Sequence, residues 1–178
     1  MSVFWLKGYA ATSTDDLLQA MKIGRQSMYD TFGDKRRLYV EALERYQREN
    51  VTGHIDRLRS TSSPLAGIEA LVVGLISLDK TTCERGCMGV GSISEFGNTD
   101  TEVAKLRAKS NYVLHKALVE RLRDAQAAGE IRATVDIADA ARFVQTTMLG
   151  LQVAARAGGS AQALRETAAF AIAALRNR

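Results

Sequence analysis

The chain has 178 residues, of which 46% are hydrophobic and 25% charged, and this balance excludes an intrinsically disordered protein. A formal net charge of +4 is too small to indicate a nucleic-acid partner by itself. A single proline, few aromatic residues and abundant Ala, Leu, Arg and Glu favour helix.

The chain carries no charged-then-apolar signal sequence at its start, and the apolar run 65–78 contains Glu69 and is too short to cross a bilayer. Two cysteines, Cys83 and Cys87, are too few for a disulfide framework. We therefore expect a cytoplasmic protein with no membrane partner.

The first helices are predicted by their capping residues. Ser13 with Asp16 predicts the start of a short helix, which residues 22–24 interrupt. A second short helix follows over Arg25–Phe32 and ends at Gly33. Asp34 is then placed to cap a long helix that runs from residue 35 to about residue 54.

The remainder of the chain also shows helical periodicity, and no segment alternates with period two. The predicted starts are Ser63–Pro64, a short segment at Met88–Phe96, a capping box at Thr99–Glu102, and caps at Asp136 and Ser160. The sequence therefore predicts an all-α protein with about nine helices.

Two short helices separated by a three-residue break, the second polar outside, form a helix-turn-helix pattern. In such a unit the first helix holds the second while leaving its outer face free for the major groove. The predicted inner contacts are Leu17, Ile23, Met28 and Phe32, and the predicted outer residues are Arg25, Gln26, Ser27, Asp30 and Thr31.

Several of these side chains have the chemistry for reading DNA. Arg25 can bind guanine and Gln26 adenine through paired hydrogen bonds, whereas Asp30 either accepts from cytosine or points away. Ser13, at a helix N-terminus, is suited to a phosphate. The predicted DNA contacts are Thr12, Ser13, Arg25, Gln26, Ser27, Tyr29, Thr31 and Lys35. The alternative is a set of packed helices with a solvated polar face.

The stretches 7–13, 16–18 and 23–38 resemble the DNA-binding region of TetR-type transcriptional regulators, most specifically in the run Tyr29-x-x-Phe32-x-x-Lys35-x-x-Leu38. The resemblance implies a DNA-binding head over 1–50 and a helical-bundle domain over 51–178 that binds a small effector and dimerises. It also implies a repressor that the effector releases from a palindromic operator.

Two departures from the family pattern stand in the head. Only residues 1–7 are left to form the first helix, so we expect this helix to be shortened. Lys22 occupies a turn position where the family commonly has glycine, and a left-handed lysine there costs about 1 kcal/mol. These departures keep open a helical ligand-binding or scaffolding protein with an impaired DNA head.

The alanine-rich last two helices predict a dimer seam, since small residues let helices approach closely. The predicted seam residues are Phe143, Thr147, Leu151, Leu164, Ala168 and Ile172, with burial inside the chain as the alternative. A predicted effector pocket among the middle helices is lined by Leu75, Met88, Ile93, Phe96, Tyr112, His115 and Met148, each of which could equally be plain core.

Cys87 precedes a short helix and has Arg85 nearby, two features that favour a thiolate and a redox sensor, with Cys83 as a resolving thiol. The alternative is a small buried hydrophobic residue. His54 and His115 are too far apart in sequence to suggest a metal site. Without a phosphate loop or nucleophile elbow, we expect neither an enzyme nor a cofactor.

Overall fold

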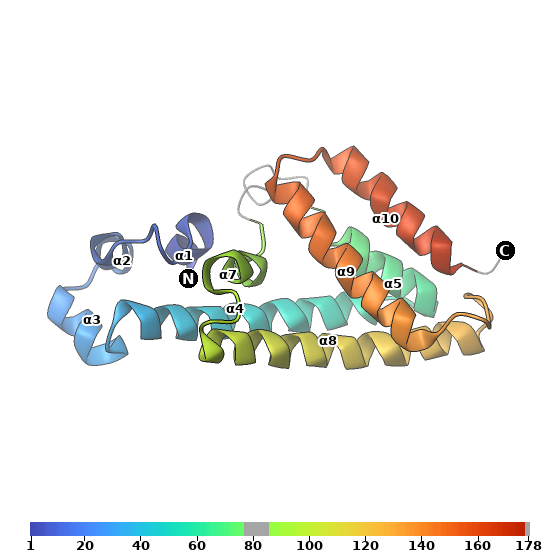
Figure 1. Ribbon diagram of the computed structural model, residues 1–178, viewed down its shortest axis with the longest axis horizontal. Helices are drawn as coiled ribbons and strands as arrows, with labels where there is room; N and C mark the ends of the chain where they lie inside the picture. The colour runs from blue at the N-terminus through green and yellow to red at the C-terminus, as the bar shows by residue number, and fades with distance from the viewer. Residues whose placement is uncertain (77–85, 177–178) are drawn as a thin grey trace. The chain divides into compact units, whose positions relative to one another are not determined.

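The computed structural model describes residues 1–76 and 86–176. Its helices are α1 (Ser2–Lys7), α2 (Thr14–Met21), α3 (Arg25–Phe32), α4 (Lys35–Leu58), α5 (Pro64–Val73), α7 (Met88–Phe96), α8 (Thr101–Ala127), α9 (Ile137–Arg156) and α10 (Ala161–Leu175) (Figure 1). An isolated antiparallel bridge joins Ile131 and Arg176, and the described ranges contain no strand. The predicted all-α class is confirmed.

Five of the predicted caps are observed. Each side-chain oxygen accepts the N–H three residues on, which satisfies one of the free donors of a first turn. These caps are Ser13, Asp34, Ser63, Asp136 and Ser160. Local sequence was therefore sufficient to predict where these helices begin.

The predicted start of α8 was wrong by one residue. Asp100 accepts from the N–H groups of Glu102 and Val103, each at 3.1 Å, whereas the Thr99 hydroxyl donates to the carbonyl of Phe96. A carboxylate caps a helix as well as a hydroxyl does, and the Thr99 hydroxyl is already bonded to the Phe96 carbonyl. One predicted end also moved, because α4 continues to Leu58 instead of ending near residue 54.

The chain forms two compact units. The first contains residues 1–49 and 87–109, and the second contains residues 50–86 and 110–178, so that α4 and α8 each contribute to both. The predicted division into 1–50 and 51–178 assigned segment 87–109 to the second domain, whereas its contacts lie in the first unit. The short helix α7 therefore belongs to the first unit, where Glu95 and Phe96 contact the turn after α1 and Phe96 also contacts Tyr39 of α4.

The core of the first unit is rich in aromatic residues. Tyr39 of α4 lies edge-on to Phe4 of α1, with ring centroids 5.1 Å apart. Phe96 of α7 lies 5.2 Å from Tyr39 and 5.2 Å from Tyr9. Figure 1 shows α7 beside α1, and these rings fill the space that the two helices share with α4.

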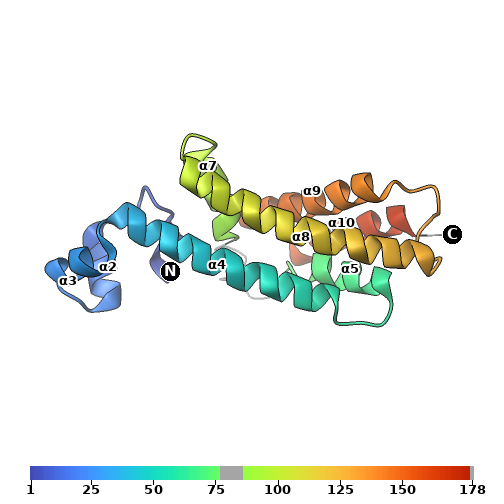
Figure 2. The same ribbon diagram turned by 90° about the horizontal axis from the view of Figure 1, so that it is seen from below.

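The second unit is a helical bundle in which α9 and α10 form an antiparallel hairpin near α5 (Figure 1). Figure 2 shows α5 returning along the end of α4 after the loop 59–63. At this return a Cβ on Gly67 would lie 2.2 Å from the Leu58 carbonyl oxygen, so only glycine permits the close approach. In the described ranges no helix is both long and apolar enough to cross a membrane.

Four of the predicted dimer residues belong to this bundle's own core. Leu151, Leu164, Ala168 and Ile172 are buried within the chain and offer no surface to a partner, which corrects the prediction for these positions. In sequence, an apolar helix face that packs inside the chain cannot be told from one that packs against a partner. In the α9–α10 hairpin this face packs inside the chain. Of the other two, Phe143 is exposed and Thr147 half-buried. The large exposed apolar side chains of α9 and α10 are Phe143, Leu149, Val153 and Phe170.

Candidate nucleic-acid interface

Helices α2 and α3 are joined as the sequence predicted. Lys22 ends α2 in the left-handed conformation, with φ 55° and ψ 41°, at the position where the family commonly has glycine. Leu17 and Met28 are buried in the core of the first unit, and Ile23 and Phe32 pack against it. The inner face of the predicted helix-turn-helix is confirmed, and the strained lysine is tolerated.

The outer face of α3 is open to solvent. Its exposed residues are Arg25, Gln26, Ser27, Tyr29, Asp30 and Thr31. Two of them already have acidic partners, since Arg25 donates to Asp15 at 2.6 Å and Gln26 donates to Asp30 at 2.7 Å. Each of the two best-suited base readers is therefore bonded to a carboxylate in the free protein.

The N-terminus of α2 carries a complete capping box. Ser13 and Asp16 exchange bonds, and Lys7 donates to the Asp16 carboxylate at 2.7 Å. The bond from Lys7, followed by the N–H and hydroxyl of Ser13, lowers the pKa of Asp16 to about 2. The exposed Ser13 therefore lies at an ordered helix N-terminus, which is suited to a phosphate.

Thr12 differs from its prediction as a DNA contact. Its side chain is 1% exposed, and its hydroxyl donates to the Gly8 carbonyl at 2.5 Å. The hydroxyl therefore closes the turn between α1 and α2 and does not reach the surface.

Lys35, a predicted DNA contact, is the first residue of α4, which begins directly after α3. Its ammonium group lies 4.4 Å from the centre of the Tyr9 ring, a cation–π geometry that holds a flexible side chain in place. The Tyr9 ring in turn contacts Tyr39 and Phe96. The Lys35 ammonium group thus lies over an aromatic cluster whose rings come from α4, α7 and the turn after α1.

Sequence reasoning missed the contribution of segment 95–102 to this head. Glu95 accepts from the N–H groups of Tyr9 and Ala10, each at 2.9 Å. Arg36 forms paired bonds with Asp100 and a further bond of 2.9 Å with Glu102. The N–H of Val103 and then Arg36 lower the pKa of Asp100. No local pattern could have found these partners, since 64 or more residues separate them.

The predicted effector residues fall in both units. Met88, Ile93 and Phe96 belong to the first, and Leu75, Tyr112, His115 and Met148 belong to the second. Met88 and Met148 are buried core residues, whereas the Tyr112 side chain is 64% exposed. His115 shares a hydrogen bond of 2.8 Å with Gln145. The effector pocket stays a prediction.

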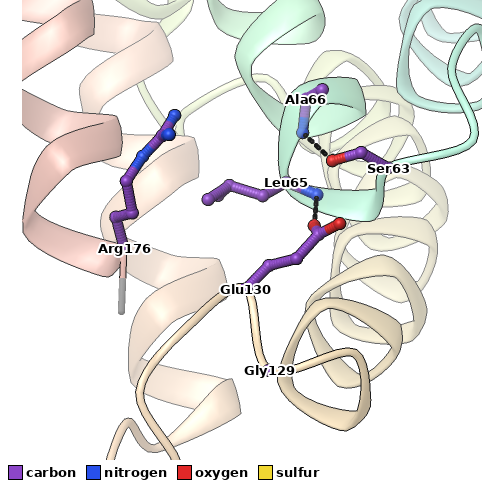
Figure 3. Close-up of a pocket in the computed structure, with 6 residues that line it drawn as sticks. All are labelled: Ser63, Leu65, Ala66, Gly129, Glu130 and Arg176. Carbon is purple, nitrogen blue, oxygen red and sulfur yellow. Dashed lines mark hydrogen bonds between the residues drawn. The ribbon is translucent and has the colours of Figure 1, made fainter. Parts of the chain in front are cut away.

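A pocket of about 410 Å³ lies elsewhere in the second unit, and none of its residues was predicted to contact an effector. Figure 3 shows it lined by Ser63, Leu65, Ala66, Gly129, Glu130 and Arg176. Its polar groups largely bond one another, since Glu130 accepts from the Leu65 N–H at 2.6 Å and Ser63 caps Ala66. A carboxylate of the chain itself therefore occupies the N-terminus of α5.

Cys87 lies at the N-cap of α7, as predicted, but its residue is only 8% exposed. Burial, followed by the neighbouring Cys87 thiol, raises the pKa of Tyr46. Cys83 and Arg85 lie outside the described residues. In the described part of the chain, no group of three or more His, Cys, Asp or Glu side chains could hold a metal ion.

Two family models match the chain. One, described as the tetracyclin repressor-like C-terminal domain, matches residues 64–171, and the other, described as bacterial regulatory proteins of the tetR family, matches residues 1–42. The chain is 27% identical over 172 residues to the HTH-type transcriptional repressor ComR of Escherichia coli, covering 94% of this chain and 81% of ComR. It is 30% identical over 158 residues to the HTH-type regulator YezE of Bacillus subtilis, covering 88% and 81%.

Solved structures give the same result. A cysteine mutant of the TetR-family regulator CifR, complexed with 26-base-pair operator DNA, is 27% identical with a TM-score of 0.76, covering 97% of this chain and 91% of CifR. A TetR-family regulator from Agrobacterium tumefaciens has a TM-score of 0.85 at 21% identity, covering 99% and 93%, and shows the shared fold alone.

Proposed function

Because the chain belongs to the TetR family of transcriptional regulators, we propose that it is a repressor that binds an operator through α3 as a homodimer and releases it when a small effector binds. The relatives support this role, since ComR is a repressor and CifR is seen on operator DNA. We place its action in the cytoplasm and propose no enzymatic activity.

The observation that carries the proposal is the open outer face of α3. Arg25, Gln26 and Tyr29 are exposed on one short helix, while Met28 fastens the same helix to the core. Side chains of this kind read base edges in the major groove. Ser13 and Lys35, at the starts of α2 and α4, flank this helix in the chain and supply the phosphate contacts of the proposal.

The homodimer proposal uses the exposed face of the α9–α10 hairpin. Phe143, Leu149, Val153 and Phe170 are large apolar side chains that remain at the surface of α9 and α10. Pairing two such hairpins about a two-fold axis would cover them. Two copies of α3 would then meet major grooves one helical turn, or a multiple of it, apart on a palindromic operator.

Repression is relieved in this proposal by a population shift. The effector binds the second unit more tightly in the form that does not bind DNA, so its presence lowers the population of the competent form.

The proposal is tested by DNA binding across a salt series. The protein should bind a labelled duplex from the promoter region of its own gene. The logarithm of its affinity should fall linearly with the logarithm of the salt concentration. Lys35→Met should weaken binding equally for all sequences and make the slope less negative by about one. Lys109→Met, an equal charge loss on an exposed position of α8, is the control. Wild-type protein that binds no such duplex at low salt would refute the proposal.

A further inference from the structure

The turn between α1 and α2 is fastened by a residue from a distant part of the sequence. Glu95, near the end of α7, accepts from the Tyr9 N–H with Oε2 and from the Ala10 N–H with Oε1, both at 2.9 Å. A Cβ on Gly8 would lie 2.7 Å from Oε1, so the carboxylate fits the turn because residue 8 has no side chain. The contact is close, two-pronged and charge-assisted.

The platform that carries this carboxylate is itself fixed. Arg107 of α8 donates to the Ser92 carbonyl at 3.1 Å and to the Gly97 carbonyl, which satisfies acceptors at the end of α7. Phe96, the next residue after Glu95, contacts the Tyr9 ring. The pair Glu95–Phe96 therefore holds both the backbone and the side chain of Tyr9.

Two predicted DNA contacts depend on the position of that turn. The turn leads directly into Ser13 and the N-terminus of α2, the proposed phosphate site. The Tyr9 ring also carries the Lys35 ammonium group at 4.4 Å. A displacement of residues 9 and 10 would therefore move one phosphate contact and remove the support of another.

Resting on the proposed function, we propose that Glu95 is a positioning residue for operator binding. It acts through the α1–α2 turn, whose two N–H groups it holds, and it sets where Ser13 and Lys35 present their donors. Affinity for DNA accordingly depends on an acidic residue on α7, although removing an acidic residue would by charge alone strengthen binding to a polyanion.

The test uses this opposition between charge and geometry. Glu95→Gln raises the net charge by one, but its amide nitrogen faces an N–H where the carboxylate had an acceptor. We expect about tenfold weaker binding to a duplex selected by the wild-type protein. Glu44→Gln makes the same charge change on an exposed position of α4 and should bind as tightly as wild type or more tightly.

A second variant separates the effect of side-chain length from the effect of charge. It also provides a test if Glu95→Gln does not fold. Glu95→Asp keeps the charge but shortens the side chain by one methylene, so it should also bind more weakly. Because phosphate contacts are lost, the salt slope of both variants should become less negative by about 0.9 per contact. A loss of stability in the first unit alone would lower the unfolding temperature. The molecules that stay folded would then bind DNA with the wild-type salt slope.

The outcomes decide between two failures. Wild-type protein without salt-dependent binding overturns the proposed function and this inference with it. Wild-type binding combined with a Glu95→Gln variant that behaves like Glu44→Gln overturns the inference alone. If Glu95→Gln does not fold, Glu95→Asp decides: wild-type affinity and salt slope in that variant also overturn the inference.

Discussion

Arg25 of α3 donates to Asp15 of α2 over 2.6 Å, so the residue best suited to guanine is held by a carboxylate of the preceding helix. The two side chains are 57% and 80% exposed, and exposed pairs contribute about 0–1 kcal/mol. A paired contact to guanine is worth about 1–3 kcal/mol. The ion pair can therefore orient Arg25 in the free protein and still yield to a base.

Replacing Arg25 with alanine should weaken binding to the selected duplex by about 5- to 150-fold, because a bidentate base contact is lost. It should also relax the preference at one base pair in each half-site, which competition with single-substitution duplexes measures. Arg59→Ala, an exposed residue of the second unit, loses the same charge and should keep the full preference. Unaltered base preference in Arg25→Ala would show that Arg25 reads no base.

The substitution Phe170→Glu should convert the dimer to monomers. The Phe170 side chain is 78% exposed in the single chain, so its burial against a partner would be lost and two charges would be brought together at the seam. Sedimentation at several concentrations measures the change. Gln162→Glu, at an exposed position of the same helix, should stay dimeric. A dimeric Phe170→Glu variant would place the interface elsewhere.

Stability should fall as the pH is lowered from about 6.5 to 4. Burial, followed by the nearby Arg57 guanidinium, lowers the pKa of His54 to about 4, so in this window the unfolded chain takes up a proton that the folded chain does not. The loss amounts to about 3 kcal/mol and is absent above the unfolded value.

Denaturant unfolding at several pH values tests this. His54→Gln should flatten the dependence of the unfolding free energy between pH 4 and 6.5, whatever its effect at neutral pH. His115→Gln should retain the dependence, because His54 is still present in it. An equally steep dependence in His54→Gln would assign the titration to other groups.

Cys87 should react slowly with a thiol reagent in the folded protein, because its residue is only 8% exposed and a reagent must reach the sulfur. The rate is measured in a Cys83→Ser background so that one thiol reports, and denaturant should raise it sharply. Fast reaction in the native protein, together with an oxidant-dependent loss of DNA affinity, would instead support the sensor role predicted from the sequence.

The sequence by itself determined five of the helix starts and the outward face of α3. Ser13 and Asp34 act on N–H groups three residues away, and the period of Leu17, Met28 and Phe32 fixes the buried side of each short helix. These interactions are local, so they can be predicted from neighbouring residues without knowledge of the fold.

Only the tertiary structure decided which apolar faces are covered by the chain itself and which distant carboxylate holds the head. Leu164 and Phe170 stand on one alanine-rich helix, yet one is buried and the other exposed, because packing of the α9–α10 hairpin chooses the face. Glu95 meets Tyr9 across 86 positions of sequence. Such contacts depend on how helices pack together in space, and the spacing of residues along the chain does not predict that packing.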